Sequence, residues 1–182
     1  MIHYLSKTLL RLLGWKSIIS IDEPAKSVVC IAPHTSNCDF LIGQLFSLVW
    51  NRKYSFLMKK DWFFFPLGPI FRALGGIPVD RSRKNSLTDL LVEEFESRSY
   101  FHLAITPEGT RGLVHEWKMG FYYIALKAQV PIQLAYIDYS KKEVGITKLF
   151  YPTGNEQADL AEIQSYFRGR VARHPEKFNL SK

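Results

Sequence analysis

The stretch VVCIAPHTSNCDF, residues 28–40, places an apolar run, a polar turn and the start of a second apolar run next to one another. The first run, residues 28–32, predicts a buried strand, and Pro33 disfavours helix at the residue before it. Three residues of the N-cap type follow at positions 35–37, and the apolar run after them predicts a helix that extends to about residue 50. Strand, turn and helix in this order indicate one unit of an α/β fold.

Outward from this stretch, short apolar runs alternate with segments of helical length. The expected strands are residues 28–32, 54–58, 77–79, 101–105 and 132–139, and the expected helices are 40–51, 69–74, 87–98 and 120–129. Residues 143–150 are expected to form a hairpin with 132–139, and residues 159–173 a final amphipathic helix. The pattern predicts one α/β domain with a mixed, mostly parallel sheet flanked by helices.

The composition is that of a globular domain with excess positive charge. The 182 residues are 47% hydrophobic and 23% charged, which is enough for one core. The net charge of +7 favours an anionic partner, which is a membrane surface, nucleic acid or a phosphate-bearing substrate. Two cysteines, Cys30 in the expected strand and Cys38 in the polar turn, form no disulfide framework and no metal-ligand pattern. This cysteine usage fits a reducing compartment, and we expect Cys30 in the core.

Residues 1–22 are predicted to form an amphipathic membrane-surface helix, with residues 23–182 making up the rest of the same domain. Three basic residues interrupt its apolar residues, so the continuous apolar core of a signal peptide is missing. Trp15 lies near its end, as is typical of helices in a membrane interface. A helix packed on its own domain explains the same periodicity equally well. The longest uncharged apolar stretch, residues 40–51, is too short to span a bilayer.

His34 and Asp39 flank the start of the expected helix. Ser36, with Asp39 three residues later, matches a capping box, which explains these two residues without any chemistry. His34 needs another explanation. From the entering loop it comes within reach of Asp39, whose carboxylate then accepts a hydrogen bond from the imidazole and leaves the other ring nitrogen to take a proton from a substrate hydroxyl. Cys38 is also close to His34, but no oxyanion loop accompanies it, which disfavours a cysteine nucleophile.

Two further stretches combine short strands with residues that suit a site. GGIPVDR, residues 75–81, ends in Arg81, whose guanidinium suits a phosphate clamp, although a surface salt bridge to Asp80 explains it as well. VPIQLAYID, residues 130–138, is a strand entered through a proline. It is expected either in the core or in the wall of an acyl site.

TPEGTR, residues 106–111, follows the expected strand 101–105. Its proline and glycine predict a turn that leaves Glu108, Thr110 and Arg111 outside the sheet. The turn is either a site for a polar headgroup or an ordinary polar turn. Shortly after it another apolar helix begins, whose N-terminus is suited to face an anion.

The ordered set of H-x4-D after a strand, GGIPVDR, TPEGTR and VPI resembles the four sequence blocks of the glycerolipid acyltransferases, the lysophosphatidic acid acyltransferase (1-acylglycerol-3-phosphate O-acyltransferase) family. The resemblance covers roughly residues 28–138. It implies a mixed α/β fold with an N-terminal helical element that touches the membrane, His34 as the general base and Asp39 as its orienting partner. The residues that it implies for the phosphate region of the acceptor are Arg81, Glu108, Gly109, Thr110 and Arg111.

The function implied by this resemblance is acyl transfer at a membrane surface. A fatty acyl group would pass from acyl-CoA or acyl carrier protein to the hydroxyl of a lysophospholipid such as lysophosphatidic acid. The thioester is a co-substrate, and no metal or other cofactor is expected. We expect a peripheral protein on the cytoplasmic face of the membrane. The alternative is a non-catalytic, basic, peripheral membrane-binding module in which His34 is structural.

The aromatic residues distinguish among the anionic partners. They fall in apolar runs such as DWFFFP, residues 61–66, rather than between basic residues on a strand, so nucleic acid is not an expected partner. The overlapping stretch WFFFPLGPIF, residues 62–71, suits insertion into a bilayer, the lining of an acyl channel or a buried core segment.

Overall fold

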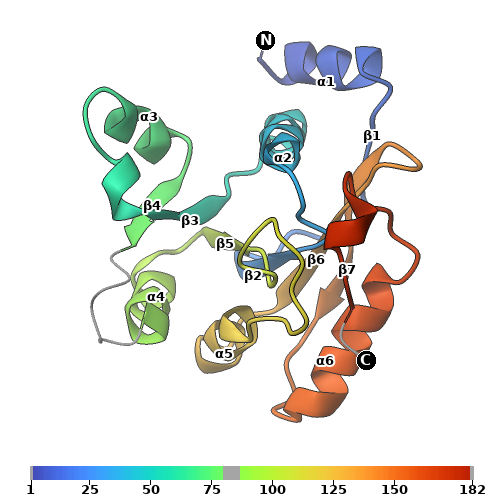
Figure 1. Ribbon diagram of the computed structural model, residues 1–182. Coiled ribbons are helices and arrows are strands. Elements are labelled where there is room, and N and C mark those ends of the chain that lie inside the picture. Colours follow the sequence, from blue (N-terminus) through green and yellow to red (C-terminus); the bar gives the residue numbers. More distant parts are fainter. Residues whose placement is uncertain (1, 80–86, 181–182) are drawn as a thin grey trace.

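Seven strands form one sheet in the computed structural model, which describes residues 2–79 and 87–180 (Figure 1). Their order across the sheet is β1-β7-β6-β2-β5-β3-β4, and every neighbouring pair is parallel except β6 with β7. This confirms the predicted α/β fold and the predicted hairpin. The strands are β1 (Lys16–Ile19), β2 (Lys26–Ile31), β3 (Ser55–Lys59), β4 (Gly76–Val79), β5 (Phe101–Ile105), β6 (Ile132–Asp138) and β7 (Glu143–Phe150).

Helices cover both faces of the sheet. Helices α1 and α2 pack on one face, and α4, α5 and α6 pack on the other, while α3 lies beyond β3 and β4 (Figure 1). The helices are α1 (Ile2–Leu12), α2 (Asn37–Trp50), α3 (Leu67–Ala73), α4 (Leu87–Ser97), α5 (Gly120–Lys127) and α6 (Glu156–Phe167). Short 3-10 helices follow β3 (Lys60–Trp62) and α6 (Pro175–Lys177).

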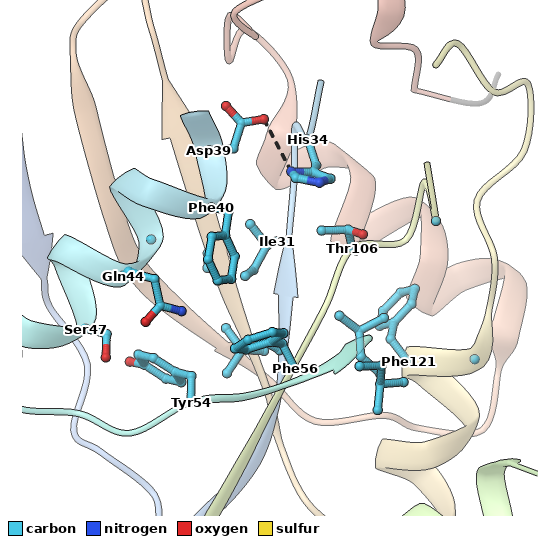
Figure 2. A pocket seen from close by; sticks show the side chains of 18 of the residues that line it. Ile31, His34, Asp39, Phe40, Gln44, Ser47, Tyr54, Phe56, Thr106 and Phe121 are labelled. Carbon is cyan, nitrogen blue, oxygen red and sulfur yellow. Dashed lines mark ion pairs between the residues drawn. The ribbon is translucent and has the colours of Figure 1, made fainter. Parts of the chain in front are cut away.

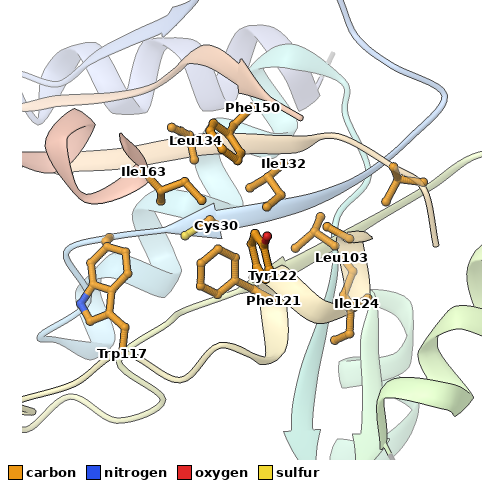
Figure 3. Packing of buried hydrophobic residues seen from close by; sticks show 14 of the residues in the cluster. Cys30, Leu103, Trp117, Phe121, Tyr122, Ile124, Ile132, Leu134, Phe150 and Ile163 are labelled. Carbon is orange, nitrogen blue, oxygen red and sulfur yellow. The ribbon is translucent and has the colours of Figure 1, made fainter. Parts of the chain in front are cut away.

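Strand β2 is the centre of the hydrophobic core. Successive side chains of a strand point to opposite faces, so Val28 and Cys30 join the cluster under α4, α5 and α6, whereas Val29 joins the cluster under α2. Figure 3 shows Cys30 among the side chains of Phe121 and Ile132. The expected core position of Cys30 is confirmed, and burial raises the pKa of its thiol, which keeps it unreactive.

The N-terminal segment differs in extent from the helix expected over residues 1–22. Helix α1 ends at Leu12, and Lys16–Ile19 forms the edge strand β1, parallel to β7. Four residues are too few for a strand period to show in the sequence. Helix α1 contacts the domain through Ser6 and Leu10, which are buried, and leaves most of its apolar side chains exposed.

The two other departures concern the end of the chain and the aromatic stretch. Helix α6 ends at Phe167, so the helix expected over residues 159–173 is too long, and the chain after it runs back along β6. In the stretch 62–71, Trp62 and Phe65 are 52% and 87% exposed, so a buried core segment is wrong for these side chains. No helix among the described residues combines the length and the apolar character needed to cross a bilayer.

Candidate active site

The loop between β2 and α2 is fixed by the carboxylate of Asp39. Its Oδ2 accepts hydrogen bonds from the backbone N–H groups of Thr35 and Ser36, each at 2.8 Å, while the Ser36 hydroxyl accepts one from the Cys38 N–H at 3.1 Å. This is the predicted capping box, and α2 begins directly after it. The chain therefore turns from strand to helix at a defined point.

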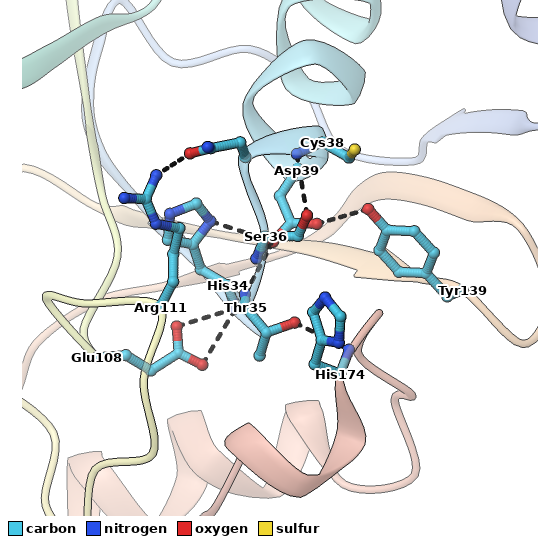
Figure 4. A network of polar contacts seen from close by, with 10 residues as sticks. His34, Thr35, Ser36, Cys38, Asp39, Glu108, Arg111, Tyr139 and His174 are labelled. Carbon is cyan, nitrogen blue, oxygen red and sulfur yellow. Dashed lines mark hydrogen bonds and ion pairs between the residues drawn. The ribbon is translucent and has the colours of Figure 1, made fainter.

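The imidazole of His34 lies over the same carboxylate, with Nδ1 3.3 Å from Asp39 Oδ2 (Figure 4). The Asp39 side chain is 2% exposed and that of His34 20%, so the acid is buried and the imidazole reaches the surface of the site. A hydrogen bond from Nδ1 to the carboxylate leaves Nε2 as a proton acceptor. The capping box and the His-Asp pair are therefore one arrangement, not alternatives.

Tyr139, directly after β6, completes the environment of Asp39. Its hydroxyl donates a hydrogen bond to Asp39 Oδ1 at 2.6 Å. Burial raises the pKa of Asp39, but the hydrogen bonds from His34, Tyr139 and the two amides of the loop outweigh it and leave this pKa below its usual value. Asp39 is thus ionised at neutral pH. Tyr139 is not among the site residues predicted from the sequence, although a hydroxyl-bearing residue after a buried strand is a usable signal.

Glu108, from the loop after β5, supports the His34 loop from the other side. Its two carboxyl oxygens lie 2.9 and 3.1 Å from the backbone nitrogen of His34, which donates to them, and the residue is 1% exposed. Burial raises the pKa of Glu108 to about 8. Its described contacts are with the loop, and the expected contact with the acceptor stays a prediction.

Gly109, Thr110 and Arg111, the last three residues of TPEGTR, are exposed beside the His34 loop. Arg111 donates a hydrogen bond to the side-chain oxygen of Asn37, at the start of α2, and the Thr110 hydroxyl accepts one from the Gly112 N–H at 3.3 Å (Figure 4). Gly109 has φ +65, a conformation that glycine adopts readily, and the Lys118 side chain packs against it. The remaining predicted site residue, Arg81, lies outside the described residues.

Parallel strands explain why these residues meet. Strand β2 lies between β5 and β6 in the sheet and runs parallel to both, so the loops after all three strands emerge at one edge. His34 follows β2, Glu108 follows β5 and Tyr139 follows β6. Such an edge is where ligands bind in open α/β sheets.

A cavity of about 1090 Å³ begins at this edge and runs between α2 and the sheet and towards α5 (Figure 2). Strand β3 pairs with β5 only at Ser55 and Phe56, so the sheet opens beyond these residues. Gln44, Ser47 and Tyr54 gather at the end of the cavity that lies away from His34. The apolar part of its lining includes Val29, Ile31, Phe40, Phe46, Phe56, Ala104, Ile105, Phe121 and Ile124.

Comparison with known proteins places this arrangement in a family. The family model described as Acyltransferase matches residues 18–137, from β1 to β6. The chain belongs to the acyltransferase family. The match includes His34, Asp39 and the TPEGTR loop, and it ends just before Tyr139.

This acyltransferase also resembles a solved structure in fold. The crystal structure of the 1-acyl-sn-glycerophosphate (LPA) acyltransferase PlsC from Thermotoga maritima superposes with a TM-score of 0.62 at 18% sequence identity. The similarity covers 94% of this chain and 80% of that one. No curated protein matches the chain. The roles of the individual site residues rest on their geometry.

Proposed function

We propose that this acyltransferase moves a fatty acyl group from an acyl thioester, acyl-CoA or acyl carrier protein, to the hydroxyl of a lysophospholipid such as lysophosphatidic acid. The observation that carries the proposal is the imidazole of His34, held by the buried carboxylate of Asp39 at the mouth of a largely apolar cavity. A base beside an apolar cavity suits a reaction between a hydroxyl and a long acyl chain.

In the proposed reaction, His34 Nε2 takes the proton of the acceptor hydroxyl as the oxygen attacks the thioester carbonyl. The Asp39 carboxylate stabilises the imidazolium that forms. The tetrahedral intermediate collapses, the carbon–sulfur bond breaks, and the departing sulfur takes the proton from the imidazolium to leave as a thiol. The reaction needs no covalent acyl-enzyme, and the thioester is the only co-substrate.

The oxyanion of the intermediate needs hydrogen-bond donors. The amides of Thr35 and Ser36 are bonded to Asp39, and the amide of Cys38 to Ser36. We assign the role to the Asn37 N–H at the positive end of α2, beside His34.

Positive charge near the cavity supports binding of a phosphate-bearing acceptor. Lys118 and Arg72 line the cavity, and Arg111 lies beside the His34 loop. Arg81 keeps its proposed part in this binding, as does the TPEGTR loop. Guanidinium and ammonium groups are the usual partners of phosphate oxygens.

We place the enzyme peripherally on the cytoplasmic face of the membrane. Helix α1 exposes Leu5, Leu9 and Leu12 by 69%, 41% and 80%, and carries basic residues between them, which suits an interfacial helix on anionic lipid. The exposed aromatic residues Trp62 and Phe65 supply a second apolar contact.

Flotation with phosphatidylglycerol-containing vesicles tests the proposed membrane contact of α1. Leu9→Glu should lose the bound fraction and Tyr151→Glu, an exposed residue elsewhere, should keep it; equal binding by both contradicts the assignment.

Thioester turnover tests the reaction itself. Purified protein in detergent receives palmitoyl-CoA or palmitoyl-acyl carrier protein with lysophosphatidic acid or another lysophospholipid, and thiol and acylated lipid are measured together. We expect equal amounts of the two products, and thiol release that requires the acceptor. Thiol release at the same rate without acceptor would indicate a thioesterase, and no turnover with either donor across the acceptors would reject the proposal.

A further inference from the structure

We propose that Tyr139 is a positioning residue for the His34–Asp39 pair. Its hydroxyl donates to Asp39 Oδ1 at 2.6 Å, on the oxygen that does not contact His34. Tyr139 lies beyond residues 18–137, which the family model matches, so the family pattern does not include it. The catalytic part of the inference rests on the proposed function, whereas the contact itself does not.

The two oxygens of Asp39 have separate partners. Oδ2 receives the amides of Thr35 and Ser36 and faces His34, and Oδ1 receives the Tyr139 hydroxyl. The two amides hold the carboxylate at Oδ2, and the bond from Tyr139 adds a second fixed point at Oδ1 and takes part of the negative charge. Tyr139 therefore contributes to both the direction and the strength of the contact between Asp39 and His34.

Tyr139 is itself held by parts of the chain that are far apart in sequence. Its ring forms a T-shaped pair with the ring of Trp15, with ring centroids 5.0 Å apart and planes at 89°. Its backbone N–H donates to the Val171 carbonyl oxygen at 2.9 Å. The same C-terminal segment contacts the catalytic loop, because the His174 N–H donates to the Thr35 hydroxyl at 3.2 Å. The ring contact and the backbone hydrogen bond together fix the position of the Tyr139 hydroxyl.

Within residues 2–79 and 87–180, the charged and titratable groups that act on the Tyr139 hydroxyl include Asp39 and Cys38 on α2, and Arg173 on the C-terminal segment. Burial and the bond to Asp39 raise the pKa of Tyr139, so the hydroxyl keeps its proton and remains a donor throughout the working range of a histidine base. The contact with Asp39 is therefore constant across the pH range that matters for catalysis.

Removal of the hydroxyl has a consequence that a purely structural role would not have. Without Tyr139, the charge on Asp39 is less shared and attracts a proton on His34 more strongly. The acid limb of the pH profile of kcat/KM should then move to higher pH. At the pH optimum kcat should fall about tenfold, the effect of one hydrogen bond to a charged group, with little change in KM for the acceptor.

The test compares Tyr139→Phe with Tyr122→Phe. The control removes the same kind of bond, from Tyr122 to Asp159 Oδ2 at 2.8 Å between α5 and α6, away from the site. Both variants should lose some stability, and only Tyr139→Phe should lower kcat and move the acid limb. An unchanged kcat and limb in folded Tyr139→Phe, or the same change in Tyr122→Phe, overturns the inference.

A second readout is independent of turnover. The imidazole of His34 is titrated by NMR in the native protein and in Tyr139→Phe, with His34→Gln used to assign its signal. We expect the midpoint to move to higher pH in Tyr139→Phe. A moved midpoint in a protein without acyl transfer keeps the positioning role and rejects the proposed function. An unmoved midpoint in a protein with acyl transfer rejects the positioning role and keeps the proposed function.

Discussion

The imidazole of His34 and the carboxylate of Asp39 lie 3.3 Å apart, and this carboxylate also caps the N-terminus of α2. The acid is therefore placed by the helix start itself, because its hydrogen bonds to the loop amides would be lost if the side chain moved. The proposed base, His34, therefore has a partner whose position is already fixed. Asp39 therefore has two proposed roles, to cap α2 and to hold the base. Substitutions in the loop should separate the effect on stability from the effect on rate.

Substitution of Ser36 and Asp39 should separate capping from catalysis. Ser36→Ala removes one half of the capping box and should cost about 1 kcal/mol of stability, with kcat/KM changed only a few-fold. Asp39→Asn should lower the rate by roughly a hundredfold or more, because the amide stabilises the imidazolium poorly. Urea unfolding and steady-state kinetics measure the two effects. Equal rate losses in both variants would show that the cap alone explains Asp39.

Glu108 should make stability fall as pH rises through neutrality. Because burial raises its pKa to about 8, the folded chain binds a proton that the unfolded chain releases at its ordinary, lower pKa. Between these two values stability should decrease with pH, by at most about 1.4 kcal/mol per pH unit. Glu108→Gln mimics the protonated side chain and should remove this slope while keeping activity, whereas Glu108→Ala should lose activity. A slope unchanged in Glu108→Gln contradicts the assignment.

His102 should act with the opposite sign at lower pH. Burial lowers its pKa to about 4, and its ring lies in a buried network with Ser27 and Gln133. An unfolded histidine protonates near pH 6.5, so stability should be lost as pH falls from there to about 4, by about 3 kcal/mol in all. Because the effect of Glu108 on this slope has the opposite sign, the unfolding free energy is measured at pH 7 and at pH 5 for both the native protein and His102→Gln. The change between the two pH values is then compared between the two proteins. An equal pH dependence in both proteins would be inconsistent with a neutral buried histidine.

Gly43 should report on the use of the cavity. It lies inside α2, lines the cavity, and a Cβ atom at this position would meet nothing within 4 Å. Gly43→Ala should raise stability by about 0.5–1 kcal/mol, because alanine loses less backbone entropy in a helix. Gly43→Leu fills the space and should lower kcat/KM for palmitoyl-CoA about tenfold more than for octanoyl-CoA. The same loss with both donors would place the acyl chain elsewhere.

The central part of the fold and of the site could be predicted from the sequence because it depends on local signals. The apolar run of β2, the capping residues and the five-residue spacing of His34 and Asp39 all lie within residues 28–40. The expected position of His34 in the loop that enters the helix, with Asp39 near the helix start, predicted that the carboxylate would reach back to the imidazole. The structure shows both that contact and the capping box on the same residue.

The remaining features depend on contacts between distant segments. Tyr139 meets Asp39 only because β6 is the neighbour of β2, and the order of strands is not visible in one sequence. Glu108 reaches the His34 amide for the same reason, because it follows β5, the other neighbour of β2. The edge strand β1 has four residues, and its pairing with β7 comes from the completed sheet. Local periodicity predicts elements, whereas residues that join loops across the sheet require the topology.

The most direct test of the central claim is the rate of acylated lysophosphatidic acid formation by the native protein, His34→Ala and Cys38→Ala, with folding verified for each. Cys38 is the control because it is a free cysteine in the first turn of α2, close in sequence to His34, and a cysteine nucleophile is the alternative to a histidine base. If His34 is the general base, His34→Ala should lose about a thousandfold in kcat/KM and Cys38→Ala should stay close to native. A folded His34→Ala with near-native turnover, or loss of turnover in Cys38→Ala instead, would contradict the mechanism.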